Sequence, residues 1–153
     1  MKTIFKDLWE IHSTLKDGEY IVITTNGATR KNDGYAIMGR GCALEATQRF
    51  PDIQKRLGIQ LLRYGNHVFF CPEYKLFTFP VKVSWEMQAD LNLIRKSCQE
   101  LVEEIKKEKA VHAYLAFPGV GKGRRAIDEV MPVLEPILGN APVTLVRRPS
   151  EKL

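Results

Sequence analysis

Two glycine-rich segments hold the residues of this sequence that are best suited to chemistry. Residues 38–43 read Met-Gly-Arg-Gly-Cys-Ala and run into a predicted helix, and residues 118–123 read Pro-Gly-Val-Gly-Lys-Gly and also lead toward one. Backbone amides at the start of a helix bind anions, and glycines let a diphosphate approach the chain closely. Glycine also serves ordinary turns, so a phosphate site and two structural turns remain open alternatives.

Two polar residues follow the first two predicted strands. Asp7 comes directly after a short strand expected over residues 3–5, and Asn26 follows a clearer one over residues 20–24. Ligands of open α/β sheets bind beyond the carboxyl ends of the strands. Asp7 is therefore either a ligand-binding group or the cap of a short turn.

The common nucleotide-binding motifs do not fit these loops. A Walker motif requires Gly-Lys to be followed by Ser or Thr, with another glycine five positions before it. Here Gly123 follows Gly121 and Lys122, and Ala116 occupies the earlier position. The dinucleotide pattern G-x-G-x-x-G fails as well, because Leu44 stands where its third glycine belongs. The sequence also contains no recognisable Ser/His/Asp or Cys/His set.

Composition narrows the class of protein. The chain has 153 residues, of which 44% are apolar and 27% charged, as in ordinary globular domains. No apolar run approaches the roughly 20 residues that cross a bilayer, and we see no signal peptide at the start. The three cysteines and three histidines are scattered, which argues against a disulfide framework or a zinc site. We expect a cytoplasmic protein without metal, cofactor or membrane contact.

The net charge of +5 attracts polyanions such as nucleotides and nucleic acids. The excess is diffuse, because Lys106, Lys107 and Lys109 share their predicted helix with three glutamates. A solvated helix face is therefore favoured over a nucleic-acid patch. A basic nucleic-acid-binding domain stays as an alternative, and a steep salt dependence of binding would reveal it.

Strand and helix patterns alternate along the chain. Strands are expected over residues 67–71, 76–79, 111–117 and 143–146. Helices are expected over residues 42–49, from Asp52 to Leu57 with Gly58 as the stop, and over about 89–109; a further apolar-periodic segment, 127–137, contains two prolines that should kink or shorten it. This order predicts one domain over residues 1–153, with a mixed, mostly parallel sheet covered by helices on both faces. Residues 149–153 are expected to form a loose tail.

The motifs, taken in order, resemble the macrodomain family. They are Lys6-Asp7-Leu8-Trp9, then residues 38–43 leading on to Phe50, then Pro118-x-Val120-Gly121-x-Gly123. The resemblance spans nearly the whole chain and is closest to the branch of the terminal ADP-ribose protein glycohydrolase and the DNA ADP-ribosyl glycohydrolase antitoxins. It implies a three-layer α/β/α fold that binds ADP-ribose and hydrolyses an ADP-ribosyl linkage or ADP-ribose-1″-phosphate. The implied partner is ADP-ribose or an ADP-ribosylated protein or nucleic acid, bound by a monomer.

The resemblance also implies roles for single residues. Asp7 would accept a hydrogen bond from the adenine amino group, with Leu8 beside it, and Asn26 would lie near the distal ribose. Lys82 would be the nucleophile that attacks C1″ of that ribose, for which a lowered pKa suits a lysine; its alternative is an ordinary surface lysine. The two loops would bind the diphosphate and the distal ribose, through Gly39, Arg40, Gly41, Cys42 and Ala43 in the first and Gly119, Val120, Gly121, Lys122 and Gly123 in the second.

The sequence departs from this pattern in one respect. In the lysine-dependent relatives an acidic residue follows the second loop closely and assists cleavage, whereas here Arg124 and Arg125 follow it and the first acid is Asp128. The arginines and Lys122 could instead strengthen anion binding. A reader that binds ADP-ribose without turnover is therefore the main alternative to an enzyme.

Overall fold

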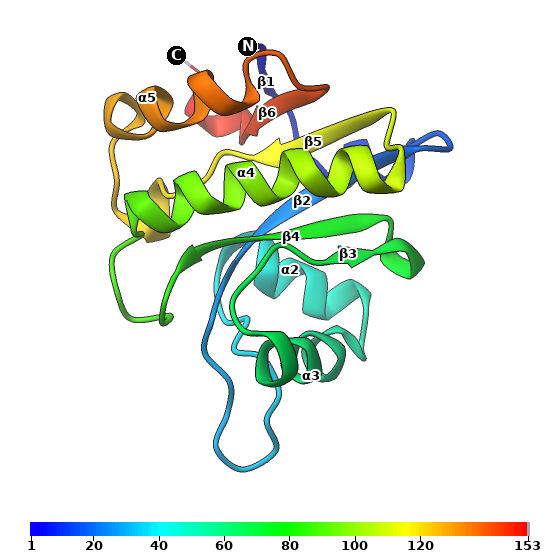
Figure 1. The fold of residues 1–153 in the computed structure, drawn as a ribbon, viewed down its shortest axis with the longest axis vertical. Helices are drawn as coiled ribbons and strands as arrows, with labels where there is room; N and C mark the ends of the chain where they lie inside the picture. Colours follow the sequence, from blue (N-terminus) through cyan, green and yellow to red (C-terminus); the bar gives the residue numbers. More distant parts are fainter. Residues whose placement is uncertain (153) are drawn as a thin grey trace.

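The computed structural model describes residues 1–152, and it places their strands in one sheet (Figure 1). The sheet has six strands in the order β1-β6-β5-β2-β4-β3. All neighbouring pairs are parallel except β3 and β4, which are antiparallel. The strands are β1 (Thr3–Phe5), β2 (Glu19–Asn26), β3 (Phe70–Cys71), β4 (Leu76–Lys82), β5 (His112–Ala116) and β6 (Val143–Arg147).

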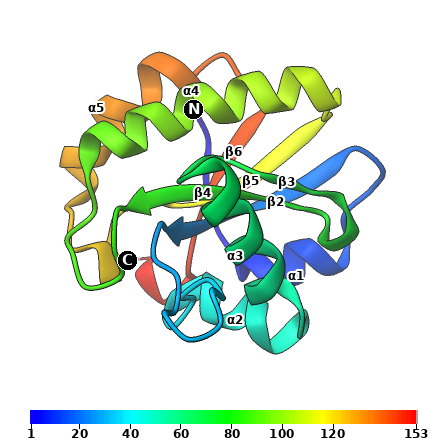
Figure 2. The same cartoon turned by 60° about the horizontal axis from the view of Figure 1, so that its bottom comes forward.

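Helices cover both faces of this sheet (Figure 2). On one face α1, α2 and α3 pack around Ile21 and Ile23 of β2. On the other, α4 and α5 pack around Val22 of the same strand. The predicted mixed, mostly parallel three-layer α/β/α fold is confirmed. The helices are α1 (Leu8–Ser13), α2 (Gly41–Arg49), α3 (Ile53–Tyr64), α4 (Leu91–Glu108) and α5 (Ile127–Leu138), with short 3-10 turns η1 (Pro72–Tyr74), η2 (Gly121–Gly123) and η3 (Pro149–Glu151).

The prediction that Gly58 ends a helix is wrong. Helix α3 continues through Gly58 to Tyr64, and a Cβ atom at Gly58 would collide with the carbonyl oxygen of Gly34. The glycine therefore allows the loop before α2 to pack closely on the helix. Asp52 stands at the N-cap of α3, but its side chain makes no capping hydrogen bond.

Strand boundaries also differ from the prediction. Strand β3 is shorter than expected because side chains take up the preceding amides: Val68 N donates to Glu100 Oε1 at 2.9 Å, and Phe69 N donates to Thr78 Oγ1 at 2.9 Å. Strand β4 is longer and passes through Pro80. The β2–β4 register shifts next to this proline, and a bulge is one of the places where a strand tolerates proline.

Three helical segments differ from the prediction. Residues 8–13, for which no helix was expected, form α1. Helix α5 continues through Pro132 and Pro136, while its buried Val130, Leu134 and Leu138 hold it against the sheet. In place of the expected loose tail, residues 149–151 form η3, and Leu153 lies outside the described residues.

Candidate ligand-binding cleft

A cleft of about 1380 Å³ opens at the carboxyl ends of the five parallel strands. Residues that follow β1, end β2 and β4, and follow β5 and β6 all line it. This is the edge at which open α/β sheets bind ligands. Pockets for drug-sized ligands measure about 300–1,000 Å³, so this one has room for an extended ligand of dinucleotide size.

The structure brings all the predicted site residues to this one cleft. They come from five separate stretches of the chain, and no two stretches are adjacent in the sequence. The lining includes Asp7, Leu8, Asn26, Gly39, Arg40, Gly41, Cys42, Ala43, Lys82, Gly119, Val120, Gly121, Lys122 and Gly123.

The first glycine-rich loop opens α2 onto the cleft without a side-chain cap. Arg40 occupies the N-cap position, but its side chain makes no capping hydrogen bond to the first amides of α2. Gly41 has a φ of +59°, a conformation that favours glycine. The loop can therefore present main-chain donors and the positive end of α2 to an anion.

Cys42, in the same loop, is a packing residue in this structure. Its thiol is buried and lies 3.4 Å from Thr24 Oγ1. Burial raises the pKa of the Cys42 thiol, so the sulfur stays protonated at neutral pH. It is therefore unsuited to act as a thiolate nucleophile.

The second glycine-rich loop forms the 3-10 turn η2 beside the first. Gly121 has a φ of +63°, and a Cβ atom there would meet no atom within 4 Å. The turn is closed by hydrogen bonds from Gly123 N to Val120 O at 3.2 Å and from Arg124 N to Gly121 O at 3.0 Å. Within residues 1–152 the amides of Gly121 and Lys122 have no hydrogen-bond acceptor, so they remain available to a ligand.

Asp7 caps a helix and leaves one carboxylate oxygen for a ligand. Its Oδ1 atom accepts a hydrogen bond from Trp9 N at 3.0 Å and so caps α1. Within the described residues Oδ2 has no hydrogen-bond partner, and the exposed side chain lines the cleft. One carboxylate oxygen holds the helix, and the other is free for a ligand.

Asn26 is held in place by the loop that follows it. Its Nδ2 donates to Ile37 O at 2.9 Å, and its Oδ1 accepts from Ala28 N at 2.8 Å. The side chain therefore ties the end of β2 to the loop. One amide hydrogen and one lone pair of the Asn26 side chain remain for other partners.

Lys82 is a buried lysine at the end of β4. Only 7% of its surface is exposed, and its Nζ donates to Lys122 O at 3.0 Å and to Trp85 O at 3.2 Å. Burial, and then the charges of Arg40 and Arg124, lower the pKa of the Lys82 amine. Lys82 therefore loses its proton more readily than a surface lysine, and the neutral amine is the nucleophilic form.

The carboxylates of the cleft lie on the opposite side from Lys82. Asp7, Glu10, Glu45 and Glu151 line the β1–β6 side, whereas β4 is separated from β6 by β5 and β2. Asp128, in the first turn of α5, is not among the lining residues. Within residues 1–152, none of the carboxylates that line the cleft comes from the β4 side; Glu86, next to Trp85, accepts a hydrogen bond from Ser84 and does not line the cleft.

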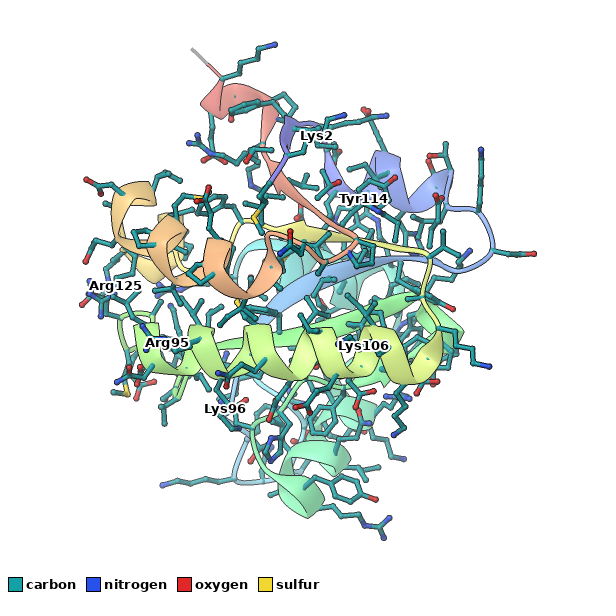
Figure 3. All side chains as sticks on the ribbon, turned by 45° about the horizontal axis from the view of Figure 1, so that its top comes forward. Lys2, Arg95, Lys96, Lys106, Tyr114 and Arg125 are labelled. Atoms are coloured by element: carbon teal, nitrogen blue, oxygen red, sulfur yellow. The ribbon has the colours of Figure 1, made fainter. Side chains whose placement is uncertain are left out.

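Arg125 has a structural role outside the cleft. Figure 3 shows it beside the amino-terminal end of α4, near Arg95. Its Nε donates to Ala89 O at 2.8 Å, and it forms an ion pair with Glu129 at 3.2 Å. These contacts tie the segment after the second loop to the start of α4, so Arg125 is not part of the candidate anion site.

Comparison with solved structures identifies the architecture. The macrodomain of Mycobacterium tuberculosis DarG superposes with a TM-score of 0.73 at 19% identity, over 95% of each chain. The macrodomain of Thermus aquaticus DarG gives 0.73 at 20% identity, over 96% of each chain. This chain has the macrodomain fold. Thermosipho africanus DarTG, solved in complex with ADP-ribose, gives 0.70 at 17% identity over 90% of this chain and 40% of that one. No protein-family model and no curated protein matches the sequence.

Two parts of the cleft wall were not among the residues predicted from the sequence. Trp85, in the loop after β4, lines the cleft, and the Arg40 guanidinium carbon lies over its ring, 5.6 Å from the ring centroid. At the other end, residues 147–151 form part of the wall, where Arg147 pairs with Glu151 at 3.1 Å and Arg148 with Glu45 at 3.3 Å. A proline at the start of a helical turn was the available signal for η3.

Residues 1–152 contain no group of three or more His, Cys, Asp or Glu side chains arranged to hold a metal ion. In the same range, no helix is both long enough and apolar enough to span a membrane.

Proposed function

We propose that this macrodomain binds ADP-ribose in the cleft and hydrolyses an ADP-ribosyl linkage there. The observation that carries the proposal is the convergence of three kinds of group on one cleft. A free carboxylate oxygen of Asp7 lies on the β1 side, two glycine-rich loops with unpaired amides lie between, and the buried amine of Lys82 lies at the end of β4.

ADP-ribose has a chemical partner for each of these groups. The adenine amino group is a donor suited to Asp7 Oδ2, and the diphosphate is an anion suited to the loop amides and the α2 amino terminus. The distal ribose would then reach Lys82 and Asn26. The DarTG structure that contains ADP-ribose shares this fold, which supports the choice of ligand.

Lys82 is our candidate for the group that cleaves the linkage. Its neutral amine would attack C1″, the C1″–acceptor bond would break, and the acceptor would leave with the bonding electron pair. The proton that the departing acceptor needs can come from the nitrogen that has just become positively charged. The ribose ring would then open: the nitrogen lone pair forms a C1″=N bond, the C1″–O4″ bond breaks, and O4″ takes the remaining N–H proton. Borohydride reduces this Schiff base, and water otherwise hydrolyses it, which releases ADP-ribose and restores the amine.

A reader of ADP-ribose without turnover is the second candidate function. The observation that favours it is that, among the described residues, no carboxylate from the β4 side lines the cleft. A product assay separates the two functions: wild-type protein is incubated with ADP-ribosylated protein, ADP-ribosylated DNA and ADP-ribose-1″-phosphate, and released product is measured. Turnover that Lys82→Ala abolishes, with a borohydride-trapped adduct on Lys82, supports the enzyme. Tight ADP-ribose binding without turnover of any of the three supports the reader.

A further inference from the structure

The Lys82 amine connects two loops that form the wall of the cleft. One acceptor, Trp85 O, belongs to the segment between β4 and α4, and the other, Lys122 O, belongs to η2. The two acceptors are 37 positions apart in the sequence, as their residue numbers show. Their link runs through a single nitrogen atom.

Other contacts between these two segments lie after Lys122. Ala89 N donates to Gly123 O at 3.0 Å, Gln88 Nε2 donates to Arg124 O at 3.2 Å, and Arg125 Nε donates to Ala89 O at 2.8 Å. Within residues 1–152, the Lys82 amine provides the hydrogen bond that holds Lys122 itself. Lys82 therefore ties the part of the loop with unpaired amides to the segment after β4.

The same contacts fix the orientation of the amine. A neutral lysine nitrogen has two N–H bonds and one lone pair around a tetrahedral atom. When Trp85 O and Lys122 O accept the two N–H bonds, the lone pair takes the remaining position. Lys82 also lines the cleft, so a ligand there can approach this nitrogen.

We propose that Lys82 is a positioning residue for the second glycine-rich loop as well as the candidate nucleophile. Its amine bridges Trp85 O and Lys122 O, which orders the amides of Gly121 and Lys122 for the diphosphate and holds the lone pair toward the cleft. This inference rests on the proposed function for the identity of the ligand. The bridge itself is a property of the ligand-free protein.

Hydrogen exchange in the ligand-free protein tests the bridge directly. The reporters are the amides of Gly123, Arg124 and Arg125, which close the loop through hydrogen bonds to Val120, Gly121 and Gly119. In Lys82→Met, which keeps the unbranched side chain up to the position of Cε but lacks the amine and its donors, we expect these amides to exchange about tenfold faster or more. Unchanged exchange in a folded Lys82→Met variant overturns the proposal.

Lys75→Met is the matched control. Lys75 Nζ also donates to a main-chain carbonyl, Lys16 O at 3.1 Å, but it precedes β4, at the opposite end of the strand from Lys82. We expect no change in exchange at Gly123, Arg124 and Arg125 in this variant. Faster exchange there would show that loss of any lysine-to-carbonyl contact loosens the loop, and would also overturn the proposal.

Calorimetric titration tests the consequence for ligands. We expect Lys82→Met to weaken ADP-ribose binding about tenfold, equivalent to about 1.4 kcal/mol, and to weaken AMP binding less, because AMP lacks the second phosphate and distal ribose. Lys82→Arg can donate to both carbonyls but cannot act as an amine nucleophile. It should restore loop protection and ADP-ribose affinity without restoring turnover.

The outcomes separate this inference from the proposed function. If wild-type protein does not bind ADP-ribose, the proposed function fails, while the exchange comparison still decides whether Lys82 orders the loop. If exchange becomes faster in Lys82→Met but ADP-ribose affinity does not change, the loop is not ordered for the diphosphate and the inference is wrong. If Lys82→Arg does not fold, Lys82→Met and Lys75→Met still give the answer.

Discussion

Asp7 offers a prediction in which helix capping and ligand binding can be measured separately. Its Oδ1 caps α1 through Trp9 N, and its Oδ2 faces no partner among the described residues. Asp7→Ala removes both oxygens. Asp7→Ser keeps one oxygen for the cap, because serine and aspartate are equally good N-cap residues, and it removes the oxygen that we assign to adenine.

The two variants should differ in stability and agree in affinity. Loss of an N-cap costs about 1 kcal/mol, so Asp7→Ala should be destabilised by that amount and Asp7→Ser by a few tenths. A hydrogen bond to a charged acceptor contributes about 1.5–3 kcal/mol. Both variants should therefore bind ADP-ribose roughly 10- to 150-fold more weakly than wild type, at about 1.4 kcal/mol per tenfold change.

Urea unfolding gives the stabilities, and calorimetric titration with ADP-ribose gives the affinities. The reasoning is refuted if Asp7→Ser retains full affinity, since Asp7 would then be only a helix cap. It is also refuted if affinity falls in Asp7→Ala alone, because the loss would follow from the altered helix rather than from the missing oxygen.

Three further predictions concern the cleft and the opposite end of the sheet. Gly39→Ala should fold normally, since its Cβ meets no atom within 4 Å, but should weaken ADP-ribose binding by about 1–3 kcal/mol through crowding; equal affinity in a titration would show that no ligand atom approaches Gly39. If Lys82 is the nucleophile, turnover should rise with pH and level off below 10.5, because burial and then Arg40 and Arg124 lower its pKa; a rate that falls with rising pH contradicts this role. Burial, and then Lys2, lower the pKa of His112 from 6.5, so the unfolded state binds more protons and stability should fall as pH drops below about 6.5; thermal melts at several pH values should show a smaller fall in His112→Gln.

The fold could be predicted from the sequence because its signals are local. The nearly continuous apolar run at residues 111–117 predicts a strand, and the three-and-four spacing of Ile94, Cys98, Leu101 and Ile105 predicts a helix with one buried face. Loops at the ends of successive strands then meet at one edge by topology. That reasoning predicts that Asp7, Asn26 and the two glycine-rich loops meet at one edge, whereas Lys82 was singled out only by the resemblance to the macrodomain family.

What the sequence could not give depends on contacts between distant residues. The sequence predicts a helix end at Gly58, whereas the structure requires glycine there because the main chain of Gly34 lies close to it. The cleft wall made by residues 147–151 depends on an ion pair between residues far apart in the sequence, Arg148 and Glu45. The two carbonyls that hold Lys82 belong to main-chain atoms, for which the residue types Trp85 and Lys122 carry no signal.

Calorimetric titration of the wild-type protein with ADP-ribose tests the central claim most directly. The proposed function assigns the cleft one place for the adenine, one for the diphosphate and one for the distal ribose, so we predict one site per chain with a micromolar Kd, about −8 kcal/mol. Ligand at 100 times its Kd should also add about 2.7 kcal/mol of stability. No heat and no thermal shift at millimolar ADP-ribose would contradict the assignment of this cleft to ADP-ribose.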